Sequence, residues 1–298
     1  MRVFLTGATG FVGSAVLREL KGAGHTVLGV ARNDEAAAKL AGWGVEAHRA
    51  DLSDPASFAA GAAACEAVVH CAFIHDFSRF VENMQIEQVA VNAMLDALAG
   101  SNRPFVITSG IALLAPGELV TEAHRGPRQG RGETEAIVLE AAARGIRTGV
   151  VRLPPSVHGD GDHGFVPRLI DIAREKGVSA HIGDGANRWA AVHRLDAARL
   201  YRLALEVGAG GSVYHAIGDT GVPTRDIAGV IARRLGVPLV SKPPAEAADH
   251  FGFLGAFFGL DVIASSESTQ ETLGWRAREP GLIPDLDRPA YFDGQSKF

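Results

Sequence analysis

The stretch "TGATGFVG", residues 6–13, constrains the fold most, because it stands between a short apolar run and an amphipathic helix. We predict a buried strand before it and a helix over residues 11–23. Gly7 permits the tight turn, Gly10 lets a ligand approach the backbone, and Gly13 lets helix and strand pack closely. The free N–H groups at the helix start then favour an anion. This order of strand, glycines and helix predicts a dinucleotide-binding unit, with an empty glycine turn as the alternative.

Strand and helix patterns alternate through the first half of the chain. Strands are expected at residues 2–7, 25–31, 45–52, 66–73, 104–110 and 147–155, and helices at 11–23, 34–44, 80–98 and after Gly132. Repeated βαβ units predict an α/β fold, a Rossmann-like doubly wound parallel sheet. We assign residues 1–153 to this domain, with 190–217 returning to it, and 154–189 and 218–298 to a smaller C-terminal substrate-binding lobe. The ligand cleft then lies over the C-terminal ends of the strands.

Composition excludes several classes of partner. The net charge is −5 and no run of Lys and Arg marks a nucleic-acid surface. No apolar run approaches the roughly 18 residues of a membrane span. The two cysteines suit a reducing compartment, and a strand beginning at residue 2 leaves no room for a signal peptide. We therefore expect a cytoplasmic protein that binds a small-molecule substrate, with no nucleic-acid or membrane partner, and leave a homodimer open.

The end of the second strand bears on the choice of dinucleotide. An acid usually stands there in NAD-binding proteins, to hold the ribose 2′-hydroxyl. Here Ala31 takes that place and Arg32 follows, and a guanidinium suits a 2′-phosphate. The sequence predicts that the cofactor is NADP(H), with NAD(H) as the alternative. Arg32 could also be a solvated surface residue without a ligand. Asp34 is expected to cap the next helix.

Further motifs extend this pattern over nearly the whole chain. "ADLSD", "VVHCAF", "VITSG", "VVRLPPSVHGDG", "AVHRLDAARL" and "ETLGW" stand at matching places, and with "TGATGFVG" they resemble the extended short-chain dehydrogenase/reductases of the epimerase/dehydratase-like family. The resemblance implies an NAD(P)-dependent oxidoreductase. Together with Arg32, it gives as cofactor-binding residues Gly7, Thr9, Gly10, Phe11, Val12, Gly13, Arg32, Asp51, Leu52, Ala72, Phe73, Pro154 and Val157.

The chain departs from that family at its catalytic pair. Members carry Tyr-x-x-x-Lys, in which the tyrosine donates a proton and the lysine lowers the tyrosine pKa. Arg131 and Glu135 stand in these places, and the only tyrosines are Tyr201, Tyr214 and Tyr291, far downstream. The chain therefore resembles the atypical members that lack this pair. Arg131 stays charged and is predicted to clamp substrate, and Glu135 is expected to support the helix N-terminus.

Two histidines are candidates for the missing acid, and one serine for holding the substrate. His75 follows the fourth strand at the edge where substrate enters, and imidazole titrates near neutral pH. His158 and Ser109 are the other catalytic candidates, with His158 a second acid and Ser109 a hydrogen-bond donor to substrate. Predicted substrate-binding residues are Asp76, Arg79, Arg131 and Ser156. Structural roles in loops and strand ends remain the alternative for each.

Two further expectations concern histidines. Four ligand-type side chains crowd the loop that holds His158, Asp160, Asp162 and His163, but they lack the separated spacing of metal signatures, so no metal site is predicted. His25, His48, His124, His181, His215 and His250 are expected at the surface or in turns.

Three functions remain open. The sequence favours an NADP(H)-dependent oxidoreductase acting on a small carbonyl, imine or alcohol without the usual pair. A catalytically silent NADP(H) sensor is the alternative, because both catalytic residues are missing. An epimerase or dehydratase ranks lowest, because Trp189 stands where an arginine for a nucleotide-sugar phosphate is expected, with Arg188 beside it.

Overall fold

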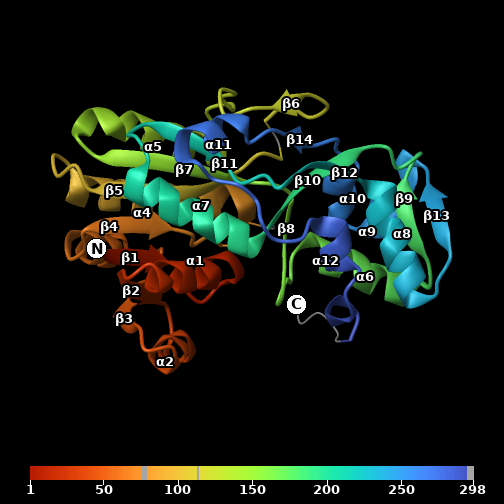
Figure 1. Ribbon diagram of the computed structural model, residues 1–298, viewed down its shortest axis with the longest axis horizontal. Coiled ribbons are helices and arrows are strands. Elements are labelled where there is room, and N and C mark those ends of the chain that lie inside the picture. The colour runs from red at the N-terminus through yellow and green to blue at the C-terminus, as the bar shows by residue number, and fades with distance from the viewer. Residues whose placement is uncertain (75–78, 113, 294–298) are drawn as a thin grey trace.

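The computed structural model describes residues 1–74, 79–112 and 114–293 and has a seven-stranded parallel sheet at its centre (Figure 1). The strands lie in the order β11-β7-β5-β4-β1-β2-β3. Their bounds are β1 (Arg2–Thr6), β2 (Thr26–Ala31), β3 (Glu46–Arg49), β4 (Ala67–His70), β5 (Pro104–Gly110), β7 (Arg147–Leu153) and β11 (Ser212–His215). The predicted Rossmann-like α/β class is confirmed.

The sheet is parallel because both of its faces are buried. Every residue of β4 is buried, and so is most of β1, as expected where helices cover both sides. The connections run to opposite edges from β1, which pairs with β2 on one side and β4 on the other. Ligands of open α/β sheets bind beyond the strand ends at such a reversal.

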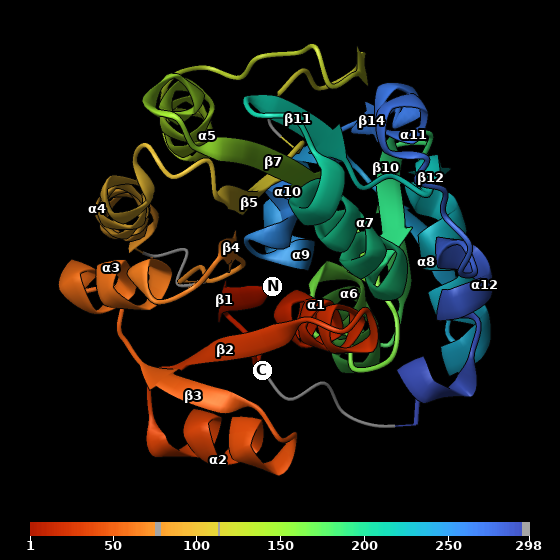
Figure 2. The same ribbon diagram turned by 60° about the vertical axis from the view of Figure 1, so that its left-hand side comes forward.

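Helices cover the two faces of the sheet (Figure 2). One face carries α1 (Phe11–Gly22) and α7 (Arg194–Val207), which pack side by side. The other carries α3 (Pro55–Ala63), α4 (Phe80–Leu98) and α5 (Arg131–Glu140). Buried aliphatic side chains of these helices form the core with the strands.

The cap of α2 (Asp34–Gly42) differs from the expectation. Asn33 is extended and its side chain accepts a hydrogen bond from the Ala36 N–H at 2.9 Å. Asp34 is the first helical residue instead, and its exposed carboxylate pairs with Arg49. Asn33 takes the cap because an extended residue aims its side chain at the free N–H groups of the first turn.

The rest of the chain forms a second lobe around the buried Trp189. Its strands are β6 (Leu119–Val120), β8 (Ser156–His158), β9 (Ser179–Ile182), β10 (Arg188–His193), β12 (Asp219–Pro223), β13 (Leu239–Lys242) and β14 (Ile263–Ala264). Its helices are α6 (Phe165–Lys176), α8 (Thr224–Leu235), α9 (Ala247–Phe251), α10 (Leu254–Phe258) and α12 (Leu282–Leu286). The helix α11 (Glu267–Leu273) packs against β11 and α7 of the sheet domain instead. None of the helices in the described ranges is long and apolar enough to span a bilayer.

Candidate dinucleotide and substrate site

The glycine turn after β1 has the geometry of a diphosphate cradle. Gly7 has a φ of +66°, and its carbonyl accepts a hydrogen bond from the Gly10 N–H at 2.9 Å. A Cβ on Gly13 would lie 2.0 Å from the Gly7 oxygen, so only glycine lets α1 start this close to the strand. Gly10 caps α1 without a side chain, which leaves the first N–H groups of the helix open to an anion. These residues fit a dinucleotide diphosphate.

The neighbouring strand ends line the same cradle. A Cβ on Gly7 would lie 2.8 Å from the Ala72 nitrogen, so the backbone after β4 runs against the turn. The Ala72 N–H donates to the Thr6 hydroxyl at 3.1 Å, which fixes this approach. Ala72 and Phe73 are half-buried just past the strand end.

The adenine end of the predicted site lies past β2 and β3. The Asp51 carboxylate accepts hydrogen bonds from the Ser53 N–H and hydroxyl at 2.9 and 2.5 Å, and these bonds lower the Asp51 pKa. Arg32 is exposed at the end of β2, close enough to act electrostatically on Asp51. Leu52 is half-buried beside it. The cation is therefore available to a ligand from solvent.

Arg131 begins α5 and reaches the end of β5. Its Nη2 donates to the Thr108 carbonyl at 2.6 Å, and its guanidinium lies over the Phe73 ring at 4.5 Å. The same Nη2 is 3.6 Å from the Glu87 carboxylate of α4. With 25% of its side chain exposed, Arg131 presents a positive charge beside Phe73, which the sequence predicts to contact the cofactor.

Glu135 does not support the helix N-terminus as expected. Its carboxylate is buried and forms a two-pronged ion pair with Arg152 of β7, which has no exposed surface. Arg152 Nη1 also lies 3.2 Å from His215 Nε2. The side chain turns inward because Arg152 needs a counter-charge inside the protein.

His215 and His250 are buried, contrary to the surface placement expected for them. Burial is the largest influence on His215 and lowers its pKa to about 4, so the imidazole is neutral next to Arg152. His215 is the last residue of β11, the edge strand of the sheet. It lies beside Arg152 because β11 pairs with β7.

A buried polar cluster of Thr6, His70 and Glu87 lies at the C-terminal ends of β1 and β4. The sequence analysis did not predict it. His70 Nδ1 is 2.8 Å from the Thr6 hydroxyl, and His70 Nε2 is 3.8 Å from Glu87 Oε1. The Thr6 hydroxyl therefore contacts both the Ala72 N–H and the His70 ring, and joins the end of β4 to β1. In the sequence, His70 is the last residue of the apolar run "AVVH", which is typical of a buried strand. Glu87 comes close to it only because α4 packs against the sheet.

Tyr201 lies beside the C-terminal end of β5, although it is 93 residues away from Thr108 in the sequence. Its hydroxyl lies 2.6 Å from the Thr108 hydroxyl, one residue before Ser109. Its side chain is fully buried, and burial raises its pKa well above the usual value. Tyr201 therefore braces β5 and has no surface on which a substrate could receive a proton.

The remaining predicted residues fall into separate groups. Ser109 is buried at the end of β5, and Ser156 is buried with a hydroxyl that has no partner among the described residues. Pro154 is buried and Val157 half-buried where β7 leads into β8. Arg79, at the start of α4, pairs with Glu82. His75 and Asp76 lie outside the described residues.

His158 is held away from the cleft surface. Its Nδ1 lies 2.8 Å from the Asp285 carboxylate, and the side chain has 0% of its surface exposed. A side chain that touched an open cleft would be exposed, so in this conformation His158 can act on a substrate only through a neighbour. Within the described ranges, no three His, Cys, Asp or Glu side chains are grouped to hold a metal ion.

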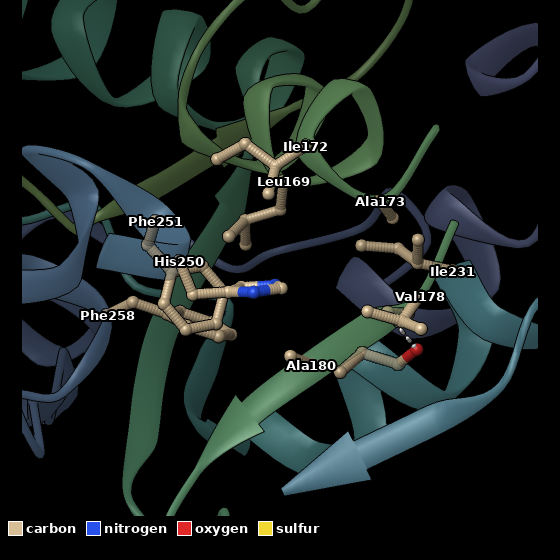
Figure 3. Close-up of a pocket in the computed structure, with 11 residues that line it drawn as sticks. Leu169, Ile172, Ala173, Val178, Ala180, Ile231, His250, Phe251 and Phe258 are labelled. Atoms are coloured by element: carbon tan, nitrogen blue, oxygen red, sulfur yellow. Dashed lines mark hydrogen bonds between the residues drawn. The ribbon is translucent and has the colours of Figure 1, made fainter. Parts of the chain in front are cut away.

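The second lobe encloses a cavity of about 10 Å³ (Figure 3). Apolar side chains of α6, β9, α8, α9 and α10 line it, with the His250 imidazole directed inward. This volume holds at most about one water molecule. It is a packing defect and not a substrate site.

The sequence is similar to a known family and to individual proteins. Residues 3–217 match the model of the NAD dependent epimerase/dehydratase family. An uncharacterized protein of Schizosaccharomyces pombe is 45% identical over 295 residues, which cover 98% of this chain and 100% of the relative. The 4-hydroxy-2-methyl-3-oxo-4-farnesyl-3,4-dihydroquinoline-1-oxide ketoreductase of Stigmatella aurantiaca is 28% identical over 95% of this chain and 84% of its own.

Solved structures agree on the fold. A dTDP-glucose 4,6-dehydratase from Streptomyces venezuelae, with NAD and TYD bound, is 20% identical and has a TM-score of 0.77. The alignment covers 98% of this chain and 97% of that one. The glycine cradle, the parallel sheet and the family match lead to one conclusion: the chain belongs to the NAD dependent epimerase/dehydratase family, within the extended short-chain dehydrogenase/reductases.

Proposed function

We propose that the protein is an NADP(H)-dependent oxidoreductase that acts on a small organic carbonyl, imine or alcohol without a Tyr/Lys pair. The observation that carries the proposal is the position of Arg131, a partly exposed cation stacked on Phe73 beside the dinucleotide cradle. When bound, the reduced dinucleotide supplies the hydride. A fixed guanidinium at this edge stabilises negative charge that develops on the substrate oxygen, although it cannot give up a proton itself.

The proton comes from another group. We propose His75, which follows the described Ile74 in the sequence after β4, with Ser109 holding the reacting oxygen or nitrogen. Asp76, Arg79 and Ser156 remain proposed substrate contacts. The burial of His158 favours a positioning role for it. Carbonyl reduction is also the activity in the name of the Stigmatella aurantiaca relative, which supports this class of reaction.

Turnover tests the reaction. NADPH and a panel of carbonyl and imine substrates, some carrying a carboxylate, are followed by loss of NADPH absorbance. General acid catalysis contributes about 10²–10⁴-fold, so His75→Ala should lower kcat by about that factor and leave the NADPH Kd unchanged. Arg131→Ala should lower kcat without removing a titration from the pH profile, because arginine does not titrate there. Normal turnover by both variants would contradict the proposal.

NADP(H) preference is the second part of the proposal, because Arg32 is exposed and Ala31 offers no competing carboxylate. A charge-assisted hydrogen bond contributes about 1.5–3 kcal/mol. Arg32→Ala should therefore weaken NADPH binding roughly 10- to 100-fold and leave the NADH Kd near its wild-type value. Titration of both dinucleotides against both proteins measures this. Tighter binding of NADH by the wild type would assign the site to NAD(H).

A catalytically silent NADP(H) sensor is the alternative that one observation favours. Glu135, at the place of the family lysine, is committed to a buried ion pair with Arg152. NADPH binding without turnover of any substrate in the panel would support the sensor. An epimerase or dehydratase has less support, because Arg188 is engaged by Asp261 at 2.7 and 3.0 Å and Trp189 is fully buried.

A further inference from the structure

The loop between β8 and α6, residues 159–164, rests on the first turn of α1. The His163 ring meets the Phe11 ring edge-on at 5.5 Å. Arg194 is the first residue of α7. Its guanidinium lies over the Phe11 ring, 4.5 Å from the ring centroid, and donates to the Ser14 hydroxyl at 2.9 Å. Its Nη1 donates to the Asp160 carbonyl at 2.6 Å. The loop is thus tied to the helix start that faces the dinucleotide.

Arg194 forms no ion pair with any of the described residues, although the Asp160 and Asp162 carboxylates act on it electrostatically from further away. Its two hydrogen-bond acceptors are a hydroxyl and a carbonyl, and its buried Nε has no partner among the described residues. Only 9% of the residue is exposed. A buried cation without an ion pair is costly, and this one stands beside a helix N-terminus that already favours negative charge. Both features point to an anionic ligand at this place.

The C-terminal strap, residues 282–292 (α12 and a short turn at Pro289–Tyr291), holds the loop from the other side. The Gly159 N–H donates to the Tyr291 hydroxyl at 2.9 Å. That hydroxyl also lies 3.3 Å from both Asp162 Oδ2 and Asp285 Oδ2. Arg288 donates to the Asp160 carboxylate at 2.7 Å. Figure 1 shows α12 next to β8.

The loop packs tightly against the start of α7. Gly159 has a φ of +130°, and a Cβ there would lie 2.8 Å from His193 Nε2 and 2.9 Å from Arg194 Cγ. A shift of the Gly159 backbone would therefore displace Arg194, which links the loop to Phe11 and Ser14. The Tyr291 hydroxyl fixes the Gly159 backbone, because it accepts a hydrogen bond from the Gly159 N–H.

We propose that Tyr291 is a positioning residue of the dinucleotide site: it locks the β8–α6 loop, which sets Arg194 against the first turn of α1 and slows release of the bound diphosphate. The inference rests on the dinucleotide site of the family and not on the proposed reaction. Because the diphosphate is common to both dinucleotides, the effect is the same for NADPH and NADH.

The test removes one oxygen atom and measures dinucleotide release. Tyr291→Phe keeps the ring but leaves the Gly159 N–H without its acceptor. We expect the release rates of NADPH and NADH, measured by stopped-flow fluorescence, to rise about 3- to 10-fold, the loss expected for one hydrogen bond. Hydrogen exchange of the Gly159 amide should become faster, and dinucleotide should no longer slow it.

Tyr214→Phe is the matched control. Its hydroxyl also accepts a backbone N–H, from Ala209 at 3.1 Å, but it lies on β11. It should lower thermal stability without changing either release rate. If Tyr291→Phe fails to fold, Arg288→Gln loosens the same loop from the surface and should also speed release.

Wild-type release rates in Tyr291→Phe with a faster Gly159 exchange would overturn the inference, because the loop would then be loose without effect. An equal effect of Tyr214→Phe would overturn it as well. A wild type that binds dinucleotide, loses it faster in Tyr291→Phe and never turns over a substrate would refute only the proposed reaction. A wild type that binds neither dinucleotide would refute both.

Discussion

Arg131 and Glu135 stand about one helical turn apart on α5, yet they face different environments. Arg131 remains at the surface of the cleft, bonded to Thr108 and stacked on Phe73. Glu135 points inward and neutralises Arg152. Of the two positions that hold the family's catalytic pair, one thus carries a partly exposed cation and the other a buried, paired carboxylate.

Loss of the Glu135 carboxylate should cost stability more than chemistry. Removing one partner of a buried ion pair destabilises by about 3–5 kcal/mol, because Arg152 stays charged. We expect Glu135→Ala to lower the free energy of unfolding by that amount and, where it folds, to keep turnover. Glu140→Ala on the same helix is the control, since its ion pair with Arg128 is exposed to solvent and contributes little to stability. Equal losses in denaturant titrations of both variants would contradict this account.

Asp162 should make stability depend on pH in the opposite sense to most carboxylates. Burial raises its pKa from 3.8 to about 6, against the hydrogen bond from the Gly164 N–H. The native carboxyl therefore binds its proton more tightly than the unfolded one, and stability is lost as the pH rises from about 4 to 6.

Asp162→Asn stays neutral and should be more stable than the wild type above pH 6. We expect a gain of about 1–3 kcal/mol, shrinking as the pH falls toward 4. Denaturant titrations at several pH values measure the difference. A difference that does not change with pH would show that the Asp162 carboxyl titrates normally.

At the scale of elements, the β1–α1 junction depends on a glycine inside a helix. Alanine usually stabilises a helix relative to glycine by up to about 1 kcal/mol. At Gly13 it should instead cost about 1–3 kcal/mol, because the methyl would meet the Gly7 carbonyl. We expect Gly13→Ala to weaken NADPH binding more than about 10-fold, since the diphosphate cradle must open.

Gly22→Ala tests the same helix at its other end. A Cβ there meets nothing within 4 Å. This variant should be neutral or slightly stabilised and should bind NADPH normally. Thermal melts and NADPH titrations of the two variants separate the local clash from the general effect of alanine.

The sequence predicted elements whose signal is local. The glycine turn, the alternation of strands and helices and the replacement of Tyr and Lys were all readable, because each depends on a few adjacent residues. The contacts of His70, Glu87 and Tyr201 were not, since they depend on how α4 and α7 pack against the sheet. The role of Glu135 was misjudged for the same reason, because Arg152 lies on another element.

At the scale of the whole molecule, buried polar links join the sheet to α11 in the C-terminal part of the chain. The His215 N–H donates to the Thr269 hydroxyl at 2.7 Å, and Thr269 donates in turn to the Glu122 carboxylate at 2.6 Å. Through Arg152, His215 also meets Glu135. Glu135 of α5 and Thr269 of α11 therefore belong to one buried polar network, which runs through Arg152 and His215.

The strap is synthesised well after the loop that it contacts. Tyr291 meets Gly159 across 132 residues, and Asp285 meets His158 across 127. A ribosome adds about 5–20 residues per second, so the loop waits roughly 6–26 seconds for the strap. During synthesis the glycine turn can meet a dinucleotide before the loop is locked. The nascent chain would then hold its cofactor weakly, and firm retention would begin only when the strap folds onto the loop.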